Sequence, residues 1–111
     1  MGNEKLMHDL IVHRLRGRYS REYSEIKVNP EGGPDIVLAS HGLTMAIVEV
    51  ETDRSITPEK AAKWKEMAHS GSRLIIMVPK ASKVKAMELL WKEGIADRVG
   101  VGSYEIVINM P

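Results

Sequence analysis

Apolar and polar residues are spaced with two different periods along the first half of the chain, and these predict one helix followed by three strands. Residues 4–16 carry apolar side chains at the three- and four-residue spacing of a helix, and Gly17 predicts its end. Strand-forming residues then occupy positions 23–28, 35–39 and 44–51, with turn-forming residues between them. Three short strands joined by turns indicate an antiparallel meander.

The second half of the chain alternates helices with strands. The dipeptide Thr57-Pro58 is typical of a helix start, and we expect this helix to reach about His69. The continuous apolar run 73–78 predicts a strand covered on both faces. Residues 82–94 predict a third helix capped by Ser82, and residues 99–108 close the chain as one or two strands. The order αβββαβαβ predicts an α/β fold with a mixed central sheet flanked by helices.

Length and composition place this pattern in one ordinary globular domain. The 111 residues match a typical domain of about 50 to 250 residues, so we expect a single domain over 1–111. No apolar run approaches the roughly 20 residues of a membrane span, and the N-terminus lacks a signal-peptide core, so a cytoplasmic protein is expected. The absence of cysteine excludes disulfides, thiolate zinc sites and a cysteine nucleophile.

Charge is balanced overall but unevenly distributed. Sixteen basic and 15 acidic residues give a net charge of +1, which is not that of a strongly basic nucleic-acid binder. Four arginines nevertheless follow one another without an acid between them: Arg14, Arg16, Arg18 and Arg21. Such a cluster is either a solvated face or a surface that contacts the phosphates of a nucleic acid.

Three carboxylates lie in or beside strands that otherwise consist of apolar residues. Glu49 and Glu51 are two residues apart and therefore share one face of a strand, and Asp35 begins the preceding strand. A three-residue loop at 41–43 pairs Asp35 with Glu49, whereas a two-residue loop pairs position 35 with Val48 and separates the acids. We expect the odd loop, because facing carboxylates can bind one hard cation. The alternative is that these acids emerge at strand ends into water.

Two helical residues could join this cluster. His8 falls within the apolar arc of the first helix, between Leu15 and Val12, and is expected to point inward. Lys60 lies at an angle between the apolar residues of the second helix, so its stem could carry the ammonium to the acids. Glu25, on the first strand, is an alternative third acid. We expect both tryptophans, at positions 64 and 91, to be core anchors.

Pro34-Asp35 followed by Glu49-Val50-Glu51 resembles the motif of the PD-(D/E)XK nuclease superfamily, and residues 11–15 are similar to the first helix of archaeal Holliday-junction resolvases. The resemblance implies a restriction-endonuclease-like fold and a Mg²⁺-dependent phosphodiesterase. It implies Asp35, Glu49 and the Val50 carbonyl as metal ligands, with position 51 helping to activate the attacking water.

Two positions depart from the family pattern. Glu51 stands where the family usually has lysine, which makes Lys60 the candidate for the missing positive charge. His8 stands where the resolvases carry a metal-linked glutamate, and imidazole suits Mn²⁺ better than Mg²⁺.

Three functions compete. The first is an endonuclease acting on DNA, including branched DNA. The second is a nuclease-fold module that has lost catalysis and binds nucleic acid or dimerises. The third is an unrelated interaction domain, which the two-residue loop would favour. Either nuclease interpretation implies a homodimer or a larger complex, because so small a domain presents little surface to a duplex.

Overall fold

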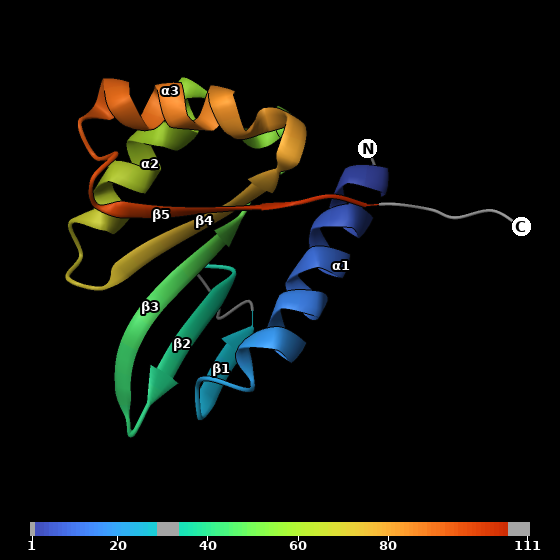
Figure 1. The fold of residues 1–111 in the computed structure, drawn as a ribbon, viewed down its shortest axis with the longest axis vertical. Coiled ribbons are helices and arrows are strands. Elements are labelled where there is room, and N and C mark those ends of the chain that lie inside the picture. The colour runs from blue at the N-terminus through green and yellow to red at the C-terminus, as the bar shows by residue number, and fades with distance from the viewer. Residues whose placement is uncertain (1, 29–33, 107–111) are drawn as a thin grey trace, which may run out of the picture.

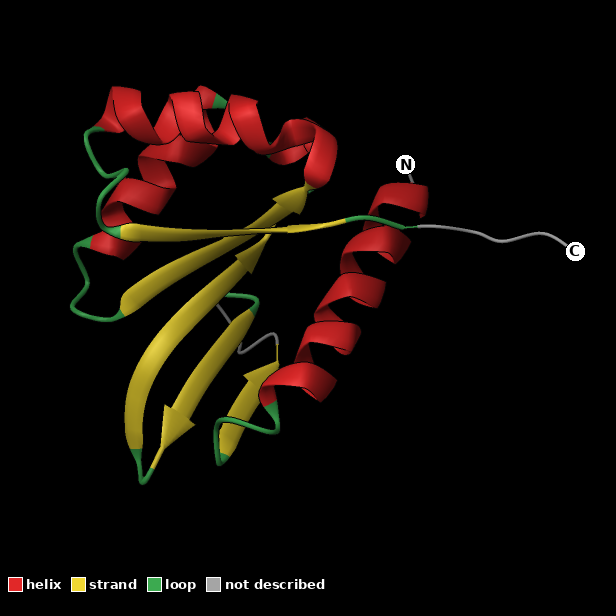
Figure 2. Ribbon diagram, viewed as in Figure 1, coloured by secondary structure: helices red, strands yellow, loops and turns green. Residues whose placement is uncertain are grey.

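The computed structural model of the protein describes residues 2–28 and 34–106. It is an α/β fold with one five-stranded sheet in the order β1-β2-β3-β4-β5 (Figures 1 and 2). The first three strands are antiparallel neighbours, and β3, β4 and β5 are parallel, so the sheet is mixed as predicted. The strands are β1 (Glu25–Val28), β2 (Ile36–Ser40), β3 (Leu43–Val50), β4 (Arg73–Pro79) and β5 (Val99–Tyr104).

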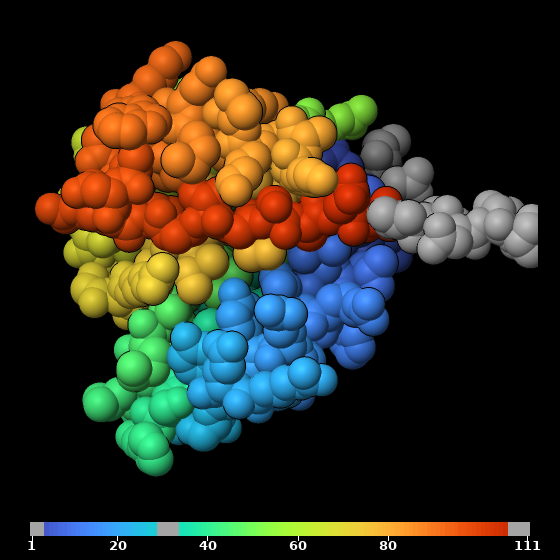
Figure 3. All heavy atoms as spheres, in the orientation of Figure 1, coloured from blue at the N-terminus to red at the C-terminus, as the bar shows by residue number. Residues whose placement is uncertain are grey.

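Helices cover both faces of the sheet. The helix α1 (Gly2–Tyr19) lies on one face, and α2 (Pro58–Ala68) and α3 (Lys83–Glu93) lie together on the other (Figure 2). Two short 3-10 turns, η1 (Asp53–Ser55) and η2 (Lys80–Ser82), precede α2 and α3. The strand β5 crosses the surface below α3 as the edge of the sheet (Figure 3).

Each face of the sheet has its own apolar core. On the α1 face, Ile11 and Val12 pack against buried residues of β2 and β3. On the other face, the fully buried Trp64 packs with β4 residues and with Leu90 of α3. The carboxyl end of β3 lies between α1 and α2, and an open α/β sheet commonly forms a site at the carboxyl ends of its strands.

The predicted boundaries of α2 and α3 agree with the structure. The Thr57 hydroxyl accepts a hydrogen bond from the Lys60 amide at 3.1 Å, and Gly94 ends α3 in the left-handed conformation with φ 73°. Ser82 is the N-cap residue of α3 as predicted, but its hydroxyl makes no capping hydrogen bond and instead donates to Asp53 at 2.8 Å. Of the predicted strand over 99–108, residues 99–104 are observed, and its last two residues lie outside the described part of the chain.

The first helix differs from its prediction in two ways. It continues past Gly17 to Tyr19, because the extra turn brings the Tyr19 ring 6.0 Å from Tyr23, an edge-to-face contact that offsets the roughly 1 kcal/mol cost of a helical glycine. Its broad apolar arc is only partly buried. Leu6 and Leu10 are 68% and 51% exposed, since the narrow meander covers just one side of the helix.

The tip of the β2–β3 hairpin overturns the expected odd loop. The loop is the two-residue turn His41-Gly42, and both residues have positive φ, at 54° and 79°, as a type I′ turn requires. A β-bulge then shifts the register: Ala39 pairs with Thr44, but Leu38 pairs with Ala46, which leaves Met45 as the extra residue. The bulge restores the pairing that the longer loop would have given.

The expectation that both tryptophans are core anchors was half wrong. Trp64 is fully buried, whereas Trp91 is 72% exposed on the outer side of α3. The helical period alone could not distinguish the buried tryptophan from the exposed one. The helix α3 is the outermost layer at that point, so only one stripe of its surface is buried against the rest of the protein. Among the described residues, no helix is long and apolar enough to cross a membrane.

Candidate functional site

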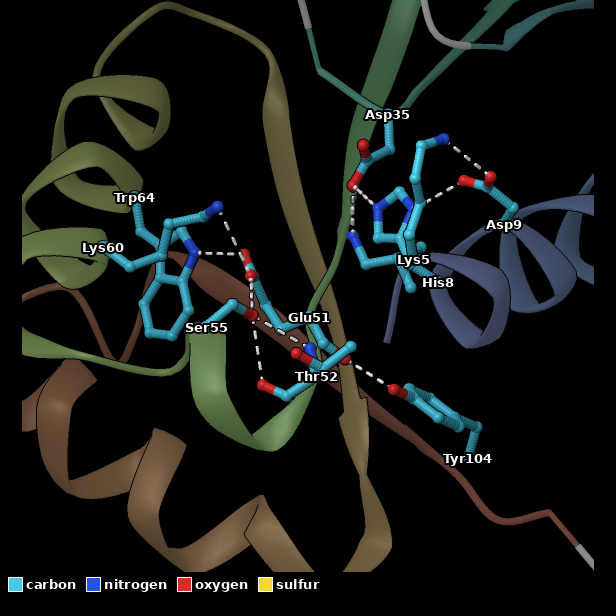
Figure 4. A network of polar contacts seen from close by, with 11 residues as sticks. Lys5, His8, Asp9, Asp35, Glu51, Thr52, Ser55, Lys60, Trp64 and Tyr104 are labelled. Atoms are coloured by element: carbon cyan, nitrogen blue, oxygen red, sulfur yellow. Dashed lines mark hydrogen bonds and ion pairs between the residues drawn. The ribbon is translucent and has the colours of Figure 1, made fainter. Parts of the chain in front are cut away.

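An open cleft of about 420 Å³ lies at the carboxyl end of β3, between α1 and α2. It gathers the residues singled out from the sequence: His8 from α1, Asp35 before β2, Glu49 and Glu51 around the end of β3, and Lys60 from α2. Figure 4 shows that their polar contacts form two groups, one around Asp35 and one around Glu51.

Asp35 lies opposite Glu49, since the register that pairs Ile36 with Val48 continues by one residue. Its Oδ2 accepts a hydrogen bond from the Val50 amide at 2.8 Å and lies 3.0 Å from His8 Nε2. Burial opposes ionisation of this carboxyl, but the hydrogen bonds from His8 and Val50 outweigh burial and keep the Asp35 pKa below its usual value. Asp35 is therefore a carboxylate at neutral pH.

His8 points inward from α1 as predicted, and it lies between two acids. Its Nε2 faces Asp35, and its Nδ1 is 3.2 Å from Asp9 Oδ1 (Figure 4). The hydrogen bond to Asp35 raises the pKa of His8 to about 9, against the opposing effect of burial and with a smaller contribution from Asp9. At neutral pH this side chain is an imidazolium, which has no lone pair to offer a metal.

Glu49 is the group whose protonation the cleft changes most. Burial raises its pKa to about 8, helped by the negative charge of Asp35, a side-chain hydrogen bond with Asp35 and the charge of Glu51, while Lys60 acts in the opposite direction. A hydrogen bond between the two carboxyls requires a proton shared by Asp35 and Glu49. Two carboxyls so close must take up a proton or bind a cation.

Glu51 is buried, and each of its carboxylate oxygens accepts a hydrogen bond from the protein. Its side chain is 1% exposed; Oε2 accepts from Trp64 Nε1 at 2.9 Å and Oε1 accepts from the Ser55 hydroxyl at 2.7 Å. The Lys60 ammonium lies 3.5 Å from the same Oε1. The structure thus places Lys60 at the acid cluster, where its position on the helix predicted it, and Glu51 fixes it there.

Sequence reasoning missed Trp64 and Ser55 as polar partners of the site. A signal for Trp64 was available, because a buried indole N–H requires an acceptor and Trp64 lies one helical turn after Lys60. No local pattern marks Ser55, whose role depends on the 3-10 turn that returns its hydroxyl to Glu51.

Other candidate residues lie outside the cleft. Glu25 accepts a hydrogen bond from the Gly42 amide at 2.9 Å, at the far end of the hairpin. Arg14, Arg18 and Arg21 line a separate pocket of about 610 Å³ around the C-terminal half of α1. Arg16 is exposed but does not line that pocket.

The donor set fits a divalent cation in part. Asp35 and Glu49 provide the oxygen ligands that Mg²⁺ and Mn²⁺ prefer, in a cleft where their repulsion favours a cation. No group of three or more His, Cys, Asp or Glu side chains arranged to hold a metal ion occurs within residues 2–28 and 34–106. The remaining ligands would therefore have to be water and backbone carbonyl oxygens.

Comparisons of this protein with models of known families, with curated proteins and with solved structures found no match.

Proposed function

We propose that this protein is a metal-dependent endonuclease with a restriction-endonuclease-like fold, which hydrolyses phosphodiester bonds of DNA, including branched DNA. One observation carries the proposal: Asp35 and Glu49 face each other in an open cleft that also receives the Lys60 ammonium. Paired carboxylates beside a lysine suit the binding of a cation and of a phosphate at the same point. The αβββαβαβ order supports the assignment of the fold.

The residues of the cleft that were predicted from the sequence each have a role in this proposal. Asp35, Glu49 and the Val50 carbonyl would hold Mg²⁺ or Mn²⁺, and a cation bound there lowers the pKa of a water and neutralises phosphate charge. Lys60 places a positive charge beside the phosphate, and Glu51 positions Lys60. A direct role for Glu51 in activating water would use an acceptor position that its hydrogen bonds from Trp64 and Ser55 leave open.

His8 determines how readily the cleft accepts a cation. While it is an imidazolium it neutralises Asp35 and competes with a metal for the same carboxylate. After losing its proton it becomes a nitrogen donor, which favours Mn²⁺ over Mg²⁺.

The basic surface and the size of the domain support a nucleic-acid partner and a homodimer. The arginine pocket of α1 supplies three guanidinium groups for phosphates beyond the cleft. Leu10 and Ile106 are exposed and line one pocket, which supplies apolar surface for a second copy of the chain. Such a dimer would act on DNA in the cytoplasm.

The alternative is a nuclease-fold module that binds nucleic acid without cutting it. The ion pair between His8 and Asp35 favours this alternative, because a protonated histidine then takes the place that a metal needs.

Cleavage of labelled duplex, flapped and four-way DNA with Mg²⁺ or Mn²⁺ separates the two functions. We expect wild type to cut at least one of these substrates and Glu49→Gln to cut none. Glu25→Gln is the matched control, since Glu25 is an exposed carboxylate outside the cleft. Salt-dependent binding without cleavage by any variant would favour the module, and equal loss of cleavage in Glu25→Gln would contradict the assigned site.

A further inference from the structure

A second cavity, of about 680 Å³, adjoins the acid cluster and has no role in the chemistry described so far. It runs along the hairpin on the side of α2, and we call it the hairpin groove. Glu49 and Lys60 line both the hairpin groove and the cleft, so the two cavities meet at the proposed reaction centre.

The groove exists because the helices cover only part of the sheet. The core formed by α2 and α3 is built on β4 and β5, which leaves Val37 of β2 and Ile47 of β3 half-buried beside α2. Met67 of α2 forms the facing wall. Val37, Ile47 and Met67 supply apolar contact area for a flat ring, and the other side chains of the groove, among them Thr44 and Ser70, are mostly polar.

Two lysines line the groove at the end next to Glu49, and Glu66, which also lines it, lies one turn after Lys63 on α2. Lys60 and Lys63 are three residues apart on α2 and therefore lie on the same side of the helix, and both line the groove. Lysine ammonium groups at the edge of an apolar groove complement a nucleotide, which has an apolar ring at one end and a phosphate at the other. The thioether of Met67 adds a favourable contact with an aromatic ring.

We propose that the hairpin groove binds a single unpaired nucleotide adjoining the scissile phosphate, with its base between Ile47 and Met67 and its phosphate at Lys60 and Lys63. A base within a duplex cannot enter the groove without leaving the stack. The inference rests on the proposed nuclease function and deepens it, because it names strands with an unpaired nucleotide as the substrate class.

The test measures metal-free binding of thymidine 3′,5′-bisphosphate by NMR titration, with the abasic deoxyribose bisphosphate and inorganic phosphate as comparison probes. We expect the thymidine compound to bind about tenfold more tightly than the abasic one, which is within the range measured for stacking one base on protein. Equal affinity for the two bisphosphates would contradict the proposal that the groove binds a base. If inorganic phosphate bound as tightly as the thymidine compound, the groove would be an anion site only, which would also contradict the proposal.

Matched variants locate the binding. Thr44→Trp fills the groove from its exposed rim, and Leu43→Trp adds the same ring to the neighbouring exposed residue outside it. Lys63→Glu reverses a charge at the groove, and Lys65→Glu makes the same change on an exposed residue that does not line it. We expect Thr44→Trp and Lys63→Glu to weaken binding roughly tenfold and the two controls less than about twofold. Equal losses in variants and controls would overturn the assignment.

The binding and cleavage experiments can contradict the base site and the nuclease function independently of each other. Nucleotide binding with these variant effects, in a protein that cuts no DNA, would support the groove and contradict the nuclease. Cleavage of DNA by a protein that binds the thymidine and abasic compounds equally would support the nuclease and overturn the groove.

Discussion

Replacement of Trp64 by phenylalanine tests whether the buried contact between the indole and Glu51 stabilises the site. Trp64 is fully buried, and its Nε1 donates at 2.9 Å to a carboxylate that is 1% exposed. Loss of a hydrogen bond to a charged group costs about 1.5 to 3 kcal/mol. The smaller ring leaves a cavity that adds on the order of 1 kcal/mol. We therefore expect Trp64→Phe to lower the free energy of unfolding by about 3 kcal/mol.

Urea and thermal unfolding followed by circular dichroism measure this change. For a domain of 111 residues, a loss of about 3 kcal/mol lowers Tm by roughly 10 °C. Trp91→Phe is the matched control, because Trp91 is 72% exposed and the same substitution there should cost less than about 0.5 kcal/mol.

A double-mutant cycle assigns the cost to the carboxylate. In the Glu51→Gln background the indole donates to a neutral amide, so removing the indole should cost about 1 to 1.5 kcal/mol less than in wild type. An equal cost in both backgrounds would refute the reasoning, as would a Trp64→Phe protein as stable as Trp91→Phe.

Three further predictions concern charge. Glu49 and His8 have native pKa values of about 8 and about 9, above their usual values of 4.5 and 6.5, so the native state binds more protons than the unfolded chain. The urea midpoint of unfolding should therefore fall as the pH rises from 5 to 9, less steeply in Glu49→Gln; a rise would contradict both pKa values. Mn²⁺ at a hundredfold excess over Kd should raise the free energy of unfolding by about 2.7 kcal/mol in wild type but not in Asp35→Ala. A wild-type Tm that does not change with added metal, and that lies below the Tm of Asp35→Ala, would indicate an unoccupied, repulsive cluster. Arg16→Ala combined with Arg18→Ala should weaken binding to every DNA sequence alike and lower the salt slope by roughly one to two units, and an unchanged slope would exclude these arginines from the interface.

The elements that depend on local pattern could be predicted from the sequence, and those that depend on tertiary contacts could not. The start of α2 follows from Thr57-Pro58 and the end of α3 from Gly94, because caps act within one turn. The exposure of Leu6 and Trp91 was missed, since it depends on which helix faces lack a neighbouring layer.

The sequence predicted which residues gather in the cleft, but part of the reasoning behind that prediction was wrong. Asp35 and Glu49 do face each other, but the loop between their strands has two residues rather than three. No feature of the sequence near Met45 marks a bulge, because its signal is the register of the neighbouring strand. The contact of Lys60 with Glu51 followed from helical angles, whereas the occupation of Glu51 by Trp64 and Ser55 required the packed structure.

The bulge at Met45 has a consequence for how this chain can change in length. Deletion of Met45 would leave Ala39 paired with Thr44 and Leu38 with Ala46 in an uninterrupted ladder, so Asp35 would still lie opposite Glu49. Deletion of a residue between Ala46 and Val48 would instead shift the pairing of Glu49 by one position and separate it from Asp35. Among relatives that keep this site, chain-length variation in the hairpin is therefore expected at its tip, before Ala46, and not in the four residues that precede Val50.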